Sequence, residues 1–207
     1  LPYPRNLYAA FLSTQDETIG NLLATLDRLK LREDTIIVFQ SDHGHSHEER
    51  AHFGGGSSGP YRGAKFSMFE GGLRVPAIIS WPGNLPEGAV RDQVAHSCDW
   101  LPTLAELAGV KLTQKDIDGK SIVSVIKNDK VKTPHDVLHW QLGRGNNPRW
   151  AVRQGDWKLI GNPQDTSKKG PITVKDKLFL VNLKESVSEM KNLAHTNPDV
   201  TQRLKKL

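Results

Sequence analysis

The sequence predicts an α/β protein with a layered core over residues 1–130 and a smaller α+β subdomain, built on an antiparallel sheet, over residues 131–207. In the first part, segments with the patterns of helix, strand, long loop, strand and helix follow one another, which is typical of layered α/β structures. After residue 130, short strand-like segments separated by turn residues replace this order. With 37% hydrophobic residues, the chain can form one good core or two small ones.

The first two elements are a long helix and a buried strand. Apolar side chains recur with the spacing of an amphipathic helix at Leu7, Phe11, Ile19, Leu22, Leu23, Leu26 and Leu29. The charged turn over residues 31–34 then leads into TIIVFQ, residues 35–40. Because this run is unbroken and rich in β-branched residues, it predicts a fully buried strand.

A long loop separates this strand from the next elements. Residues 47–66 are rich in glycine and serine, and a loop of that length in a compact domain is usually functional. VPAIIS, residues 75–80, predicts a second buried strand. A helix is predicted over about residues 100–108, because Asp99 precedes it and Gly109 can stop it.

The C-terminal part predicts four strands and a last helix. The strand-like segments, separated by turn residues, are VLHWQL, RWAVRQ, DWKLIG and KLFLVN. A helix near residues 198–207 is expected to close this subdomain.

Composition excludes little about function. A formal net charge of +5 suits an anionic substrate, but it would suit nucleic acid almost as well. Cys98 is the only cysteine, so no disulfide can form within the chain. No apolar run approaches the roughly 18 residues that cross a bilayer, and we expect no membrane partner. Without an initiator Met or a signal-peptide pattern at its start, the sequence reads as a piece of a longer protein.

Two candidate metal ligands follow the first predicted strand. Asp42 and His43 stand where ligands bind in open α/β sheets, outside the carboxyl ends of the strands. A carboxylate and an imidazole both bind divalent cations, and Gly44 could let adjacent side chains converge. The alternative is that Asp42 caps the turn and His43 packs locally.

Three further histidines lie in the long loop. His47 and His52 are five positions apart beside a glycine run, so they do not form the HExxH pattern of zinc proteases, whose histidines are one helical turn apart. A solvent-facing loop role is the simplest interpretation of His45, His47 and His52. Substrate contact stays open for His45 and His47.

Several separated segments together resemble the sulfatase family of the alkaline-phosphatase-like superfamily. SDHG, residues 41–44, resembles the family's second metal-binding motif, and GPYRGAKFSMFEGGLRVPAIISWPG, residues 59–83, resembles its basic loop and the strand after it. The segments DWLPTLAELAGV and GDWKLI also match in the expected order. The resemblance covers nearly the whole chain. It implies the C-terminal part of an alkaline-phosphatase-like sandwich domain, arylsulfatase-like, followed by the family's small C-terminal subdomain.

The resemblance assigns roles to individual residues. Asp42 and His43 become metal ligands, for Ca²⁺ first and for Mg²⁺ or Mn²⁺ as alternatives, since imidazole also admits softer ions. Lys65 matches the catalytic lysine that contacts the sulfate group. His45, His47 and Arg62 are further candidates for substrate binding. Two scaffold residues follow them, Glu70 and Arg74.

The family's nucleophile is a formylglycine made from the first residue of a Cys/Ser-x-Pro-x-Arg motif, expected N-terminal to the region seen here. Cys98 lacks the proline two positions on and the arginine four positions on, and we interpret it as a core residue. We therefore expect these 207 residues to lack the nucleophile and to be inactive alone.

These observations predict a sulfuric ester hydrolase acting on a sulfated carbohydrate or an aryl sulfate. One alternative is a phosphonate or phosphodiester hydrolase of the same superfamily, which His43 favours slightly. Another is a non-catalytic binding or structural fragment. The expected partners are a sulfated small molecule or glycan and the missing N-terminal half of the same protein, with no nucleic acid. Family analogy suggests a periplasmic or secreted location.

Overall fold

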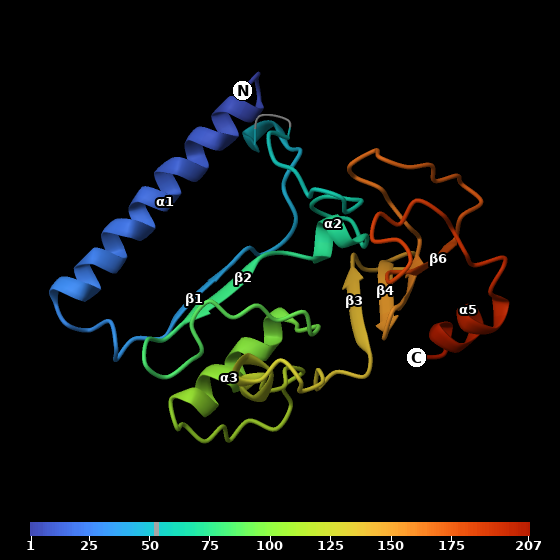
Figure 1. Cartoon of the computed structure of the whole chain (residues 1–207). Coiled ribbons are helices and arrows are strands. Elements are labelled where there is room, and N and C mark those ends of the chain that lie inside the picture. The colour runs from blue at the N-terminus through green and yellow to red at the C-terminus, as the bar shows by residue number, and fades with distance from the viewer. Residues whose placement is uncertain (52–53) are drawn as a thin grey trace. The chain divides into compact units, whose positions relative to one another are not determined.

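The structure is a computed structural model that describes residues 1–51 and 54–207 (Figure 1). His52 of the long loop lies outside the described residues. Residues 1–25, 40–77 and 137–207 form one compact unit, and residues 26–39 and 78–136 form a second. Each unit is described by itself. The domain boundary expected at residue 130 stays a prediction.

The predicted N-terminal helix is present as α1, Arg5–Arg28. None of its residues is buried, and the side chains of Phe11 and Leu22 are 68% and 57% exposed. The apolar spacing therefore predicted the conformation correctly. It did not predict burial, which needs a surface packed against the apolar side of the helix.

The two predicted core strands are present but are not fully buried, so that part of the prediction was wrong. Strand β1, Ile37–Gln40, pairs with β2, Ala77–Ser80, in a two-stranded sheet. Phe39 is 38% exposed and Ile78 is 60% exposed. An unbroken apolar strand becomes buried only when neighbours cover both of its faces, and in the described part of the chain these faces stay partly open.

A buried aspartate organises the second unit. Helix α3 is Trp100–Leu107, preceded by the 3₁₀ turn η2, Ser97–Asp99. The carboxylate of Asp99 accepts hydrogen bonds from the backbone N–H groups of His96 and Lys120, and both of its oxygens lie 2.8 Å from Nε2 of His135. Asp99 thus joins the start of α3 to a distant segment instead of capping the helix with its side chain. The short helix α4, Val123–Lys127, was not predicted.

The antiparallel sheet of the first unit confirms the strand prediction. It contains β3 (Leu138–Leu142), β4 (Arg149–Gln154), β5 (Trp157–Gly161) and β6 (Leu178–Asn182) in that order, each antiparallel to its neighbour. The last helix, α5, is Pro198–Lys205.

Both faces of this sheet are covered, which explains its apolar strands. On one face, Ile160 and Phe179 pack with Met68 and Phe69, which precede the short helix α2, Glu70–Leu73. On the other face, Leu159, Leu180 and Val152 pack with Leu204 of α5. Successive strand residues point to opposite faces, so each strand contributes to both clusters. The sheet therefore carries α2 and the backbone around it on one of its faces.

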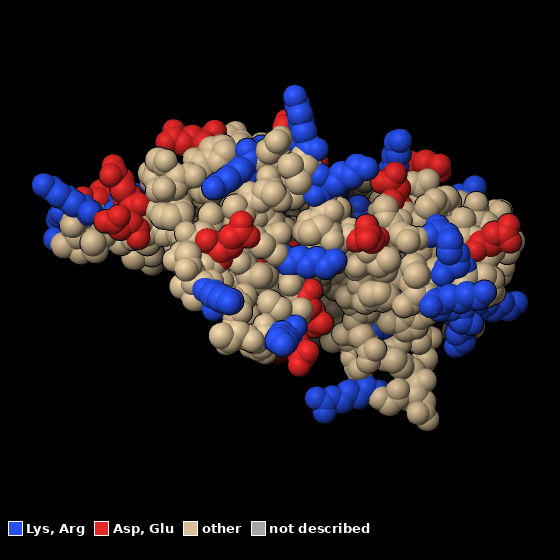
Figure 2. Space-filling view, turned by 90° about the horizontal axis from the view of Figure 1, so that it is seen from below, with Lys and Arg blue, Asp and Glu red and all other residues tan. Residues whose placement is uncertain are grey.

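No helix among the described residues is both long and apolar enough to cross a membrane. On the face shown in Figure 2, Asp and Glu side chains are interspersed among Lys and Arg.

Candidate functional site

The two candidate metal ligands converge directly after β1. Oδ2 of Asp42 lies 3.1 Å from Nε2 of His43, and the side chains are 82% and 37% exposed. Two neighbouring ligands at right angles on an ion about 2.2 Å away would be about 3.1 Å apart, within the range of calcium and magnesium sites. The functional atoms therefore share one location, as ligation requires.

The hydrogen bond on the other side of the His43 ring favours a cation at this location. Nδ1 of His43 lies 2.8 Å from the carbonyl oxygen of Gly44, so Nδ1 carries the proton and donates it. In a neutral ring, Nε2 then presents a lone pair to the carboxylate of Asp42. Two acceptors this close repel each other unless a proton or a cation lies between them. The two residues fit a divalent metal.

They are only part of a complete site. Among residues 1–51 and 54–207, no group of three or more His, Cys, Asp and Glu side chains could hold a metal ion. Ca²⁺ takes 6–8 oxygen ligands in known sites. Asp42 and His43 would therefore need ligands in addition to those that this part of the chain brings together.

Backbone contacts hold the metal-ligand loop in place. The N–H of Gly44 donates to the carbonyl of Gly72, 3.1 Å away, and the N–H of Lys65 donates to the carbonyl of His45, 2.9 Å away. A Cβ built at Gly44 would overlap the carbonyl oxygen of Gly71, so only glycine allows this approach. The loop thus rests on the Gly71–Gly72 backbone and is joined directly to Lys65.

A buried ion cluster supports that backbone. The ammonium of Lys158 on β5 lies 2.7 Å from carboxylate oxygens of both Glu70 and Glu189, and the Lys158 and Glu189 side chains are 0% exposed. The backbone N–H of Glu70 donates to the other oxygen of Glu189, 2.6 Å away. Glu70 is thus buried in the scaffold, where it was expected.

The two carboxylates that share Lys158 titrate differently. Burial raises the pKa of Glu189, with Glu70 as a further negative neighbour, although Lys158 opposes the shift. Burial also acts to raise the pKa of Glu70, but Lys158, Arg153 and Arg74 outweigh it, and the net shift is downward. The cluster therefore holds Glu70 as the ionised partner of Lys158. Sequence reasoning missed Lys158 and Glu189, although a lysine inside a strand predicted to be apolar was a signal of a buried ion pair.

Arg62 lies away from solvent, so the structure does not support the expectation that it contacts substrate. Its side chain is 0% exposed, and its Nε lies 2.8 Å from Oδ2 of Asp165. Its other two nitrogens donate to the carbonyl oxygens of Glu189 and Pro171, and the guanidinium lies 4.3 Å from the ring centre of Phe69. Every donor group of Arg62 is directed inward, so its role here is structural.

Lys65 forms an ion pair instead of pointing freely into solvent. Its Nζ lies 2.7 Å from Oε2 of Glu48, and its side chain is only 12% exposed. The same Glu48 oxygen also accepts from Arg50 and Ser46. These bonds, that of Lys65 foremost, lower the pKa of Glu48 to about 2. The lysine is thus held beside the metal-ligand loop, and Glu48 is a neighbour that the sequence did not predict.

The loop histidines lie next to each other, with ring centres 4.7 Å apart. His45 is half-buried, and burial, followed by the charges of His47 and Lys169, lowers its pKa to about 4. His45 is therefore neutral at neutral pH. Its Nδ1 atom is buried without a hydrogen-bond partner in the described part of the chain, whereas His47 is exposed.

One pentapeptide matches the spacing of the nucleophile motif, which corrects the expectation that no such match lies in these residues. Ser58-Gly59-Pro60-Tyr61-Arg62 has Ser, Pro and Arg at the required positions. However, the Ser58 hydroxyl closes a turn, 2.8 Å from the carbonyl of Tyr61, and Arg62 is buried as described above. The match therefore coincides with a structural turn. Cys98 is no better candidate, because burial raises the pKa of its thiol.

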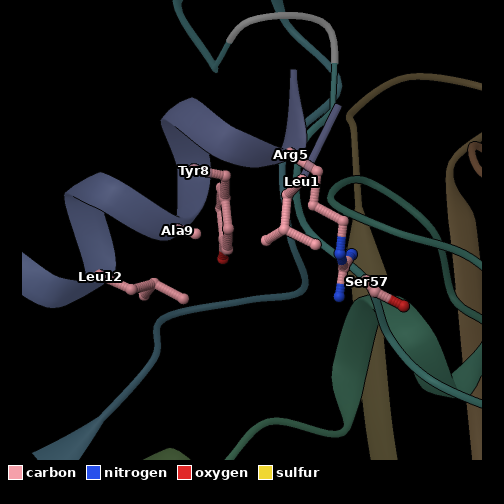
Figure 3. A pocket seen from close by; sticks show the side chains of 6 residues that line it. All are labelled: Leu1, Arg5, Tyr8, Ala9, Leu12 and Ser57. Atoms are coloured by element: carbon pink, nitrogen blue, oxygen red, sulfur yellow. The ribbon is translucent and has the colours of Figure 1, made fainter. Parts of the chain in front are cut away.

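A small hollow lies at the start of α1, lined by Leu1, Arg5, Tyr8, Ala9, Leu12 and Ser57, with a volume of about 260 Å³ (Figure 3). Its lining includes none of the predicted site residues. We assign it no function.

Comparisons with known proteins identify relatives along the whole chain. The family model "Sulfatase" matches residues 3–110, and the model "N-sulphoglucosamine sulphohydrolase, C-terminal" matches residues 63–207. Steryl-sulfatase of Mus musculus is 35% identical over 164 residues, which cover 75% of this chain and 26% of the relative. Arylsulfatase A of Homo sapiens is 30% identical over 220 residues, which cover 98% and 43%. The chain thus spans between about a quarter and two fifths of these relatives.

Solved structures with the same fold also match. Ps i-CgsB in complex with k-i-k-neocarrahexaose has a TM-score of 0.81 and 24% identity, covering 100% of this chain and 42% of that chain. BT4656 in complex with its substrate D-glucosamine-2-N,6-O-disulfate has a TM-score of 0.70 and 23% identity, covering 92% and 36%. The phosphonate monoester hydrolase of Silicibacter pomeroyi has a TM-score of 0.66 and 19% identity, covering 92% and 37%.

Proposed function

Given that the chain belongs to the sulfatase family and has its alkaline-phosphatase-like fold, we propose that it contributes metal-binding and sulfate-binding residues to a sulfuric ester hydrolase. One observation carries this proposal. Asp42 and His43 converge within 3.1 Å, and the loop that bears them is hydrogen-bonded to the backbone of Lys65. The chain thus joins a half-site for a cation to a cationic side chain.

Sulfate ester hydrolysis needs this combination of charges. An oxygen nucleophile approaches a group that is already anionic, so cations must offset charge on the non-bridging and departing oxygens. A bound divalent ion, held partly by Asp42 and His43, would supply part of that charge. We propose Ca²⁺ first, with Mg²⁺ and Mn²⁺ as alternatives, because an imidazole ligand also suits softer ions.

The residues of this chain would bind and orient the sulfate group. Lys65 would donate a charge-assisted hydrogen bond to a non-bridging oxygen. His45, neutral at neutral pH, and the exposed His47 would contact the remainder of the substrate from the same loop. Names and ligands of relatives, including arylsulfatase A and the disulfated glucosamine bound to BT4656, support an aryl sulfate or a sulfated carbohydrate as substrate.

The nucleophile is proposed to come from outside these residues. A formylglycine would supply the attacking oxygen in the intact protein, and Ser58, whose hydroxyl closes a turn, does not take this role. The isolated chain is therefore expected to be inactive.

The decisive experiment compares substrates on the full-length protein. With added Ca²⁺, we expect turnover of 4-nitrophenyl sulfate to exceed turnover of a 4-nitrophenyl phosphonate monoester, and a chelator to abolish both. The reverse preference would support a phosphonate or phosphodiester hydrolase, a second candidate favoured by the imidazole ligand His43 and by the fold shared with phosphonate monoester hydrolases. No turnover of either ester, together with no Cys/Ser-x-Pro-x-Arg motif in the coding sequence upstream of Leu1, would support a non-catalytic role.

A further inference from the structure

Glu48 and Arg50 surround the ammonium group of Lys65 with charge. Nζ of Lys65 lies 2.7 Å from Oε2 of Glu48, and Nη2 of Arg50 lies 2.9 Å from the same oxygen. Ser46 adds a hydroxyl donor at 2.9 Å and accepts from the backbone N–H of Glu48, so the carboxylate is held on four sides. Two cations and one anion leave these three side chains with a net charge of +1.

We propose that Glu48 determines charge specificity: it reduces the positive charge around Lys65 so that the site favours singly charged sulfate esters over doubly charged phosphate monoesters. The inference rests on the proposed function, in which Lys65 binds the sulfate group. It goes further by giving a role to a carboxylate that has no place in binding an anion directly.

The charges of the two esters differ by one unit. A sulfate monoester carries one negative charge, whereas a phosphate monoester carries nearly two above its second pKa of about 6. A net charge of +1 at the lysine matches the first ester and is too small for the second. Glu48 would repel each unit of substrate charge, so the dianion pays this repulsion twice.

Coulomb's law sets the size of the effect. An anion bound on another side of the Lys65 ammonium would have its charge centre about 6 Å from that of Glu48. At an effective dielectric constant between about 20 and 80, each unit of charge would change affinity by about 3- to 100-fold. Because its hydrogen bonds lower the pKa of Glu48 to about 2, the carboxylate keeps its charge throughout the working pH range.

The adjacent residue provides a matched control. Glu49 is also a carboxylate and lies in the 3₁₀ turn η1, Glu49–Ala51, but it is exposed and is not the carboxylate paired with Lys65. Glu48→Gln and Glu49→Gln therefore remove the same charge one position apart.

The test measures one ratio on the full-length protein at pH 8. For the unmodified protein and both variants, kcat/KM is determined for 4-nitrophenyl phosphate and 4-nitrophenyl sulfate, and the ratio of the two is taken. If phosphate turnover is undetectable, the reciprocal of the competitive inhibition constant of phenyl phosphate replaces its kcat/KM. A change in the amount of correctly folded enzyme affects both substrates equally and cancels in the ratio.

We expect Glu48→Gln to raise the phosphate-to-sulfate ratio by about 3- to 100-fold and Glu49→Gln to leave it within about 2-fold. An unchanged or lowered ratio in Glu48→Gln would overturn the inference, as would an equal rise in both variants. Absence of sulfate ester turnover in the unmodified protein would instead refute the proposed function on which the inference rests.

Discussion

Nε2 of His43 lies 3.1 Å from Oδ2 of Asp42, although these two residues are adjacent in the chain and follow a strand, where neighbouring side chains normally point to opposite faces. The turn at Gly44, which lies against Gly71, permits this convergence. The opposite ring nitrogen of His43 donates to the Gly44 carbonyl, which directs Nε2 toward the carboxylate.

This relationship predicts that Asp42 and His43 contribute to metal affinity. In the full-length protein, Ca²⁺ at 100 times its Kd should stabilise the native state by about 2.7 kcal/mol. We expect Asp42→Ala and His43→Ala to remove most of the resulting shift in Tm, whereas His47→Ala, a loop histidine outside the pair, should keep it. Thermal unfolding with and without Ca²⁺ measures this. A full Tm shift in both ligand variants would exclude the assignment.

Lys65 should matter for turnover far more than for stability. Removing one preorganised electrostatic donor typically costs about 10²–10³ in rate, or roughly 2.7–4 kcal/mol, so Lys65→Ala should lose that much sulfate ester turnover. Lys65→Arg should recover only part of it, since a planar guanidinium replaces a compact ammonium. Unchanged turnover in Lys65→Ala, with a Tm close to that of the unmodified protein, would remove this residue from the site.

Lys158 should be essential for stability. Lys158→Met would leave the carboxylates of Glu70 and Glu189 buried without the cation they share, and breaking a buried pair in this way typically costs about 3–5 kcal/mol. We expect a lower midpoint in urea, with partial recovery in the double variant Lys158→Met/Glu189→Gln because one excess charge is removed. Lys177→Met, at an exposed position, is the control. Equal midpoints for Lys158→Met and the control would contradict this account.

His45 should make stability depend on pH. Its pKa falls to about 4 in the folded state from an ordinary value of about 6.5, so the unfolded chain binds the proton more readily between these values. Stability is therefore lost as pH falls from about 6.5 to 4. Because the side chain is only half-buried, the loss is smaller than the 1.4 kcal/mol per pKa unit of an unscreened group. The fall in Tm between pH 7.5 and 4.5 should be smaller in His45→Gln, and an equal fall in both proteins would rule out this contribution.

Much of the fold and part of the site were predictable because they depend on local patterns. The spacing of apolar residues predicted α1 and α3, and turn residues between short apolar runs predicted the four strands from β3 to β6. The motifs around Asp42, His43 and Lys65 predicted the family, which needs only residue types in a given order.

Only the tertiary structure decided which side chains are buried and which groups pair with them. Arg62 resembled a substrate contact in sequence, but Asp165, 103 positions away, holds it in the interior. Lys65 resembled a free cation, but Glu48 neutralises part of its charge. The apolar strand β1 was expected to be buried, yet Phe39 is 38% exposed. Local sequence sets backbone conformation through steric and hydrogen-bond preferences, whereas burial and ion pairing depend on atoms that distant parts of the chain bring together.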